Sequence, residues 1–90
     1  MLKEQKNPID KIEDQLVEER NLVLYNDDYN TFDFVIDTLI EVCDHDPITA
    51  EQCTVLVHHK GKCTVKSGVL EELKPIRKEM TNRGLTVSIK

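Results

Sequence analysis

Apolar and polar positions divide the chain into two parts of different character. Residues 1–20 are polar, mixed in charge and interrupted by Pro8, and we expect them to form a flexible N-terminal arm with at most a short helix. From residue 21 onward, short apolar runs alternate with turn residues. This alternation predicts one folded domain over residues 21–90.

Three of the apolar runs have the pattern of β-strands. Leu22–Tyr25 is a continuous apolar run and predicts a strand over about 21–26. "KCTVK" alternates polar and apolar residues and predicts a half-buried strand over 62–66, which Ser67-Gly68 should end with a turn. "LTVSI", residues 85–89, predicts the last strand. The residues expected on one side of that strand are Leu85, Val87 and Ile89.

Between the first two strands the apolar spacing changes to that of helices. Asn30 or Thr31 should cap a first helix, and "DHDP" should end it and begin the next. The residues expected on its buried face are Phe32, Val35, Ile36, Leu39 and Cys43.

The second helix has two candidate starting points. Asp46 followed by Pro47 is typical of a cap and a first helical position, and "TAEQ" offers another capping start at Thr49. The helix should run to about residue 60 and end at Gly61.

A third helix is predicted over residues 70–83, with Gly84 closing it. Pro75 fits best if it falls in the first turn, because later in a helix proline removes a backbone hydrogen bond. The inner face of this helix should carry Leu73, Ile76 and Met80.

Together these elements follow the order β-α-α-β-α-β. The order predicts an α+β fold: a small domain in which a three-stranded antiparallel sheet packs against three helices on one face. Ninety residues, of which 39% are hydrophobic, are enough for one core.

Charge is distributed unevenly along the chain, whose net charge is −5. Residues 21–59 contain eight acidic residues and no Lys or Arg, whereas residues 60–90 carry a net charge of +5. An acidic centre argues against a nucleic-acid groove, because phosphates need cations, and it favours a cationic ligand. Within this stretch we interpret Asp33, Asp37 and Glu41 as solvent-facing helix residues.

The cysteines give little support to a metal centre. Cys43, Cys53 and Cys63 lie within apolar patterns, which is typical of reduced thiols in a reducing compartment. The alternative is a metal or redox site formed with the three histidines, but no C-x-x-C or H-x-x-x-H pair anchors one, so we expect no metal and no cofactor.

Membrane and export signals are also missing from the sequence pattern. No apolar run approaches the roughly 20 residues that span a bilayer, and no N-terminal signal pattern is seen. We therefore expect a cytoplasmic protein without a membrane partner.

No residue arrangement typical of an enzyme emerges, since the chain has neither a Gly-rich phosphate loop nor a recognisable nucleophile. A calcium loop starting at Asn26 would place oxygen ligands at Asn26, Asp28 and Asn30. Its sixth position is Thr31 where glycine is required, and its twelfth is Asp37 rather than Glu. We therefore reject both an enzyme and a calcium site.

The acidic corner after the first strand is better explained by recognition of a primary ammonium group. Such a group has three N–H donors and needs three acceptors. Asn26 and Asp28 supply an amide and a carboxylate oxygen, and a neutral His58 would supply a ring nitrogen. Taken alone, His58 and His59 are each typical of a histidine at a helix end. The apolar walls beside the corner would be Val35, Thr54 and Val57. The combination suits the first residue of a peptide, with its ammonium outside and its side chain inside.

Three segments carry a resemblance to a known family. These segments are "LVLYNDDYNTFDFVIDTL", then "VLVHHKGKC", and the ending "NRGLTVSI". Through them the chain resembles the ClpS adaptor family over about residues 21–90. The resemblance implies a small protein that binds N-degron substrates and hands them to the AAA+ unfoldase of the Clp protease.

The resemblance also implies site residues. The α-amino clamp of the family falls on Asn26, Asp28 and His58, and Asp27 belongs to the same motif, where we expect it mainly to shape the turn. The implied hydrophobic pocket consists of Leu24, Asn30, Phe32, Val35, Thr54, Val57 and Leu85. In the family this pocket takes N-terminal Leu, Phe, Tyr or Trp.

The partners implied by the resemblance are the N-terminal peptide of substrate proteins and the N-terminal domain of the Clp AAA+ unfoldase. Delivery in the family also uses the flexible arm. An adaptor of this size is expected to be a monomer that binds no nucleic acid.

Departures from the family pattern leave the accepted side chains open. The family usually has threonine, proline and methionine where this chain has Asn30, Thr31 and Phe32, and another methionine where it has Thr54. Phe32 would narrow the mouth, and Thr54 removes bulk and adds a hydroxyl. The alternative function is a ClpS-like interaction module that regulates the Clp unfoldase without binding degrons, because Phe32 closes the pocket. Partner contacts between Ser67 and Leu85 are not carried over, because that region is shorter than in the best-known members.

Overall fold

The computed structural model describes residues 18–90, so the predicted arm over residues 1–20 lies almost wholly outside the described residues. Six elements follow one another along the described chain. They are β1 (Arg20–Tyr25), α2 (Phe32–Cys43), α3 (Pro47–Lys60), β2 (Lys62–Gly68), α4 (Leu70–Asn82) and β3 (Thr86–Ile89). The predicted order β-α-α-β-α-β is confirmed.

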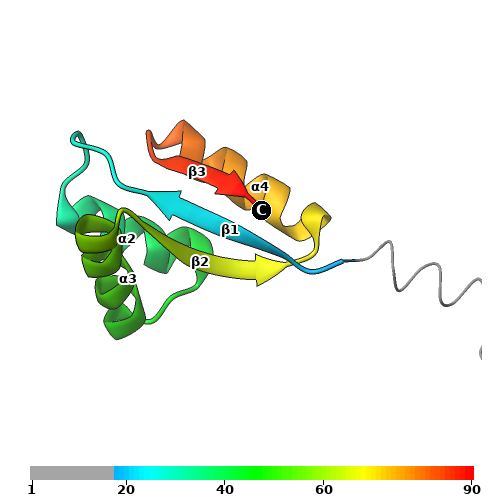
Figure 1. Ribbon diagram of the computed structural model, residues 1–90, viewed down its shortest axis with the longest axis horizontal. Coiled ribbons are helices and arrows are strands. Elements are labelled where there is room, and N and C mark those ends of the chain that lie inside the picture. The colour runs from blue at the N-terminus through cyan, green and yellow to red at the C-terminus, as the bar shows by residue number, and fades with distance from the viewer. Residues whose placement is uncertain (1–17) are drawn as a thin grey trace, which may run out of the picture.

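The strands form one antiparallel sheet in the order β2-β1-β3, with β1 in the centre (Figure 1). Leu24 pairs with Cys63 on one side and Val87 on the other. The register with β2 shifts between Leu22 and Val23. The predicted three-stranded antiparallel sheet is therefore confirmed.

The hydrophobic core lies on one face of this sheet, where the helices pack. Leu22 and Leu24 point into it from β1, since alternate residues of a strand face the same side. α2 and α3 lie together near β2, and α4 runs alongside β3 (Figure 1). Leu39, Leu73 and Met80 are fully buried, and each buried side chain of this size contributes about 1.5–3 kcal/mol to folding.

The helix starts settle two alternatives that the sequence left open. Thr31, not Asn30, caps α2, because its hydroxyl accepts a hydrogen bond from the Phe34 N–H at 3.1 Å. Asp46 rather than Thr49 caps α3, since its carboxylate accepts the Thr49 N–H at 2.7 Å. Gly61 ends α3 with a φ of 92°, a conformation that favours glycine.

The predicted turn at Ser67-Gly68 is wrong. β2 continues through both residues, which pair with Asn21 and Arg20 of β1. The Ser67 hydroxyl also donates to the side-chain oxygen of Asn21 at 2.7 Å. Because β1 starts one residue earlier than predicted, its first residues give these two a pairing partner and extend the ladder.

The predicted place of Pro75 in the first helical turn is also wrong. α4 begins at Leu70, so Pro75 is its sixth residue and cannot donate to the carbonyl one turn earlier. The residue is exposed, and water can therefore satisfy that carbonyl. Two further element ends differ from the prediction by one residue. α4 ends at Asn82 rather than residue 83, and β3 begins after Leu85, which is nevertheless buried.

Phe32 departs from the predicted buried face of α2. Its side chain is 42% exposed, whereas Val35, Leu39 and Cys43 are buried as expected, together with Thr38. Phe32 is the first residue of α2 and lies at the edge of the core rather than inside it.

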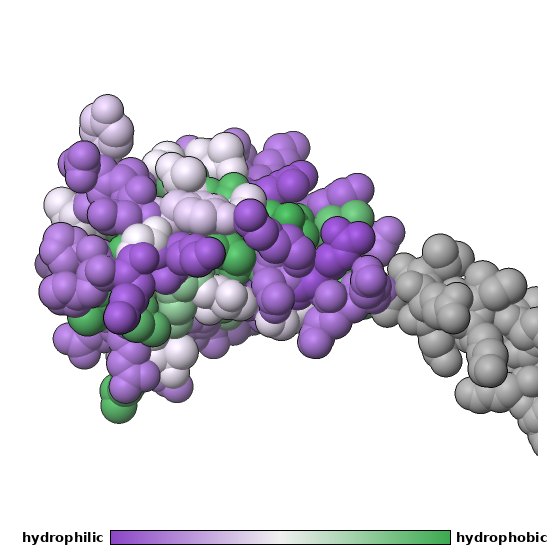
Figure 2. Space-filling model, viewed as in Figure 1, coloured by the Kyte–Doolittle hydropathy of each residue, from purple (hydrophilic) through white to green (hydrophobic). Residues whose placement is uncertain are grey.

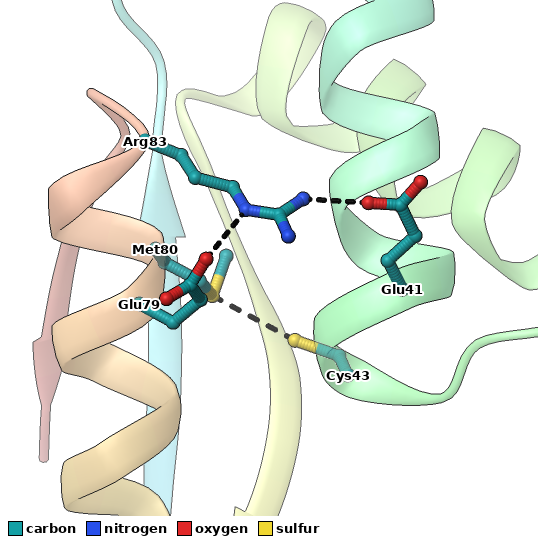
Figure 3. Close-up of polar contacts among 5 residues, drawn as sticks. All are labelled: Glu41, Cys43, Glu79, Met80 and Arg83. Carbon is teal, nitrogen blue, oxygen red and sulfur yellow. Dashed lines mark hydrogen bonds and ion pairs between the residues drawn. The ribbon is translucent and has the colours of Figure 1, made fainter.

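A polar link and a sulfur contact join α2 to α4 (Figure 3). The Arg83 guanidinium donates to Glu41 of α2 at 2.7 Å and to Glu79 of α4 at 2.9 Å. Beneath it, the Cys43 thiol lies 3.7 Å from the Met80 sulfur inside the core. These contacts fix how the two helices meet.

The outer surface is mainly hydrophilic on the face seen in Figure 2, with apolar side chains in small patches. None of the helices within residues 18–90 is long and apolar enough to cross a membrane.

Candidate functional site

A cavity of about 310 Å³ opens where β1 ends. Its walls come from the loop after β1, the start of α2, the last turns of α3 and the residue before β3. All eleven predicted site residues line it: Leu24, Asn26, Asp27, Asp28, Asn30, Phe32, Val35, Thr54, Val57, His58 and Leu85. The structure therefore brings together residues that are up to 61 positions apart in the sequence (from 24 to 85).

One tether joins the loop to the end of α3. The Asn26 N–H donates to the Gly61 carbonyl at 3.0 Å, and the Gly61 N–H in turn donates to the Val57 carbonyl at 2.9 Å. Gly61 can accept this role because its positive φ turns the chain sharply between α3 and β2. Together with the neighbouring pairing of Tyr25 and Lys62, this tether holds the end of α3, which carries His58, beside the end of β1.

The Asp27 carboxylate holds the loop after β1 in shape through hydrogen bonds within that loop. Its carboxylate accepts the N–H groups of Tyr29 and Asn30 at 2.9 and 3.0 Å and the Asn30 side-chain amide at 2.9 Å. Partial burial would raise the pKa of Asp27, but these hydrogen bonds outweigh it and leave the pKa below its usual value. Asp27 is thus a carboxylate that holds a turn.

A second tether joins the loop to the turn before β3. The Asn30 side-chain amide donates to the Gly84 carbonyl at 3.0 Å as well as to Asp27. Leu85, next in the chain, is 4% exposed and lines the cavity. The Asn30 amide therefore holds the turn before β3, and with it the cavity wall at Leu85, against the loop after β1.

The rim of the cavity presents free polar groups. The side chains of Asn26, Asp28 and His58 are exposed, and no hydrogen bond within residues 18–90 occupies them. An amide oxygen, a carboxylate and an imidazole nitrogen are thus available to a donor arriving from solution.

The interior of the cavity is apolar except for one hydroxyl. Leu24, Leu85, Val35 and Val57 are all at most 9% exposed and form the aliphatic walls. Thr54 is 3% exposed, and its hydroxyl donates to the Ala50 carbonyl one turn earlier at 2.8 Å.

Phe32 stands at the mouth of the cavity without filling it. Its ring meets the His58 imidazole edge to face, with 5.4 Å between the ring centroids. The lack of a cavity beside Asn26 would have favoured the alternative of a pocket closed by Phe32, and the structure has a cavity there.

A second hollow lies along the outer face of α3. It is larger, at about 460 Å³, but shallower, and its lining residues are Glu51, Gln52, Val55 and Leu56, all from one helix. No separate parts of the chain converge there, so we assign the candidate site to the first cavity.

The cysteines do not form a metal centre in the part of the chain that the structure describes, where no group of three or more His, Cys, Asp or Glu could hold a metal ion. Burial raises the pKa of the Cys43 thiol to about 11. Burial, and then the neighbouring Cys63 thiol, raises the pKa of Cys53 to about 12. Both thiols are therefore poor ligands at neutral pH.

Sequence reasoning missed two cavity residues and both glycine tethers. Tyr25 and Thr31 also line the cavity. Both stand next to residues that were singled out, so adjacency in the motif was the available signal. The tethers through Gly61 and Gly84 depend on backbone carbonyls, which carry no residue-specific signal.

Comparisons with known proteins agree on one family. The family model described as "ATP-dependent Clp protease adaptor protein ClpS" matches residues 17–88. An ATP-dependent Clp protease adapter protein ClpS of Nitratidesulfovibrio vulgaris is 40% identical over 67 residues, which are 70% of this chain and 67% of the relative. Another of the same name, from Pectobacterium carotovorum, is 41% identical over 59 residues, 63% of this chain and 56% of that relative.

A solved structure shares the fold. It is that of Agrobacterium tumefaciens ClpS2 bound to L-phenylalaninamide, with a TM-score of 0.78 and 22% sequence identity. The match covers 82% of this chain and 96% of that one. With a family model matching most of its length, this chain belongs to the ClpS family of ATP-dependent Clp protease adaptor proteins.

Proposed function

We propose that this protein is a non-catalytic adaptor that binds the N-terminal residue of N-degron substrates and delivers them to the Clp ATP-dependent protease. The observation that carries the proposal is the cavity with Asn26, Asp28 and His58 at its rim and aliphatic walls beneath. In the first residue of a peptide, a charged ammonium donor lies directly beside the side chain. The cavity matches this arrangement, because its rim offers hydrogen-bond acceptors and its interior offers an apolar hollow directly beside them.

The rim suits an ammonium group. Its three N–H donors would be met by the Asn26 amide oxygen, the Asp28 carboxylate and a neutral His58 nitrogen. The sequence from 21 to 59 has eight acidic residues and no Lys or Arg, which favours the approach of a cation. Asp27 would contribute charge to this field while it holds the loop.

The hollow suits an apolar first residue. Burying a Leu or Phe side chain contributes about 1.5–3 kcal/mol, and each charge-assisted hydrogen bond adds about the same. Against this stands an association cost of at least about 4 kcal/mol. At the favourable end of these ranges the surplus is about 8 kcal/mol, which corresponds to a dissociation constant on the order of micromolar and allows release to a protease. The Agrobacterium relative was solved with L-phenylalaninamide, a molecule with a free α-amine and an apolar ring.

Delivery needs a second partner, for which we propose the N-terminal domain of the Clp AAA+ unfoldase, with the adaptor acting as a monomer. The family description supports this partner class.

The test is the binding of a labelled peptide that begins with Phe, compared with its N-acetylated twin. We expect micromolar binding of the free peptide and at least a tenfold loss on acetylation, because the ammonium donors are removed. Asp28→Asn should reduce binding of the free peptide, and Asp37→Asn, on an exposed part of α2, should not. Equal affinity for the two peptides would rule out the clamp. A degradation assay with the unfoldase and protease then tests delivery separately.

A further inference from the structure

Thr54 is an unusual residue for the wall of a cavity that is otherwise aliphatic. It is one of two buried polar residues in the described part of the chain, the other being Thr38. It precedes His58 by one helical turn, so their α-carbons lie about 6 Å apart along the α3 axis. Because His58 is exposed at the rim and Thr54 is 3% exposed, α3 leads from the mouth of the cavity to its interior.

The hydrogen bond that Thr54 already makes determines whether its hydroxyl can donate to a ligand or accept from one. The hydroxyl proton is donated to the Ala50 carbonyl at 2.8 Å. A hydroxyl has one donor and two acceptor lone pairs, so what remains is an acceptor. No donor within residues 18–90 bonds to it, and the neighbouring cavity walls, Leu24, Val35 and Val57, have no polar side-chain atoms.

We infer that Thr54 makes this cavity select an aromatic first residue with a hydrogen-bond donor at its far end, the phenol of tyrosine or the indole of tryptophan. This inference rests on the proposed function. With the ammonium held at the rim, the side chain extends along α3 toward Thr54, over about the length of a tyrosine side chain. The donor would bond to the Thr54 oxygen, whereas with phenylalanine or leucine that oxygen would keep only its bond to Ala50 and its acceptor lone pairs would stay unused.

The size of the effect follows from the cost of unpaired polar groups. A buried hydrogen bond contributes modestly, but a buried hydroxyl without a partner is costly. We therefore expect a peptide beginning with Tyr to bind about three- to tenfold more tightly than the same peptide beginning with Phe. If Thr54 is replaced by Val, the tyrosine hydroxyl is buried without an acceptor, so the ratio should fall by about tenfold, to about one or below.

The experiment measures the Tyr-to-Phe affinity ratio by fluorescence anisotropy in four proteins: the wild type, Thr54→Val, Thr54→Ser and Thr38→Val. Thr54→Ser keeps a hydroxyl and should retain the preference for Tyr. Thr38→Val is the matched control, because Thr38 is buried in α2, does not line the cavity, and its hydroxyl has no hydrogen-bond partner among the described residues. Its ratio should equal that of the wild type. Circular dichroism confirms that each variant is folded.

The outcomes separate this inference from the proposed function. If both free-amine peptides bind and their acetylated twins do not, but Tyr and Phe bind equally to the wild type, the selection by Thr54 is wrong and the adaptor function stands. The same holds if Thr54→Val keeps the wild-type ratio. If neither free peptide binds, the proposed function fails and the inference with it. The wild-type comparison decides the matter even if Thr54→Val does not fold.

Discussion

The ring of Phe32 meets the imidazole of His58 edge to face, with 5.4 Å between the ring centroids and 72° between the ring planes. The two residues come from the first turn of α2 and the last turn of α3. His58 makes a similar contact with its chain neighbour His59, at 5.1 Å and 76°. Since no hydrogen bond within residues 18–90 holds the His58 ring, these two neighbours set its orientation at the cavity rim.

Removing the Phe32 ring should therefore weaken ligand binding through His58. Phe32→Ala is expected to reduce the affinity for a free-amine peptide by about two- to tenfold, since aromatic pairs contribute about 0.5–1.5 kcal/mol. Phe34→Ala is the matched control, because Phe34 lies on the same helix, is exposed to a similar extent (38% against 42%) and does not line the cavity. Titration of both variants with one labelled peptide checks this. A similar loss in both, or in neither, would contradict the role of Phe32.

The proposed acceptor role of His58 has a pH signature. A neutral imidazole can accept a hydrogen bond from the ligand ammonium, whereas an imidazolium has only donors and carries a like charge. Affinity should therefore fall as the pH is lowered from about 8 to 5.5. His58→Asn should bind with a flatter pH profile. His59→Asn removes an aromatic neighbour of His58 but keeps the His58 imidazole, so its affinity should still fall as the pH is lowered. A wild-type affinity independent of pH over this range would exclude the acceptor role.

Asp27 should stabilise the folded protein only where it is charged. Its pKa is lowered on folding, because the hydrogen bonds from Tyr29 and Asn30 outweigh the opposing effect of partial burial. A lowered pKa gives stability that is present above the usual carboxyl pKa of about 4 and is lost as the pH falls through the lowered value. Asp27→Ala should thus unfold at lower urea than the wild type at pH 7.

In acid, the same comparison should give a different result. As the pH falls below about 4, the urea midpoints of Asp27→Ala and the wild type should approach each other, since the wild-type carboxylate becomes protonated once the pH passes its lowered pKa. Asp37→Ala, at an exposed position of α2, should show no comparable change with pH. A gap between Asp27→Ala and the wild type that stays constant from pH 7 to 2.5 would mean that the carboxylate charge is not what holds the loop.

The link between α2 and α4 should depend on salt. Hydrogen bonds from Arg83 to Glu41 and then to Glu79 raise the pKa of Arg83, which keeps the guanidinium charged at all ordinary pH values. Arg83→Met should lower the melting temperature in low salt, and the difference should narrow in about 1 M salt, where the Debye length is about 3 Å. Arg77→Met is the control, because Arg77 is exposed on the same helix and forms no ion pair among residues 18–90. Calorimetry at two salt concentrations distinguishes the two variants.

The sequence predicted the types of all six described elements because each carries a local signal. Capping residues at Thr31 and Asp46 and the glycine at position 61 mark helix ends through bonds made within a few residues. The errors arose where contacts with residues distant in the sequence determine the secondary structure of a segment. Ser67-Gly68 has the composition of a turn, but pairing with Asn21 and Arg20 draws it into β2. Pro75 is tolerated inside α4 because the packing of that helix outweighs one lost hydrogen bond.

The site was predictable to the extent that it depends on residue identity. The acceptor count at Asn26, Asp28 and His58 identified a rim that the fold does assemble. The sequence did not predict the hydrogen bonds that hold this rim in place. The bond from Asn26 to Gly61 and that from Asn30 to Gly84 end on backbone carbonyls, whose positions follow from strand register and from turns that no side chain specifies.

The direction of β1 has a practical consequence. The strand runs from Arg20 toward the cavity, and its six residues separate the two ends of the sheet by about 20 Å (Figure 1). Lys90 exchanges two backbone hydrogen bonds with Asn21, at 2.9 and 2.7 Å, so the last residue lies at that same remote end. A protein anchored to a sensor surface through Lys90 would thus present its pocket outward, unobstructed by the attachment.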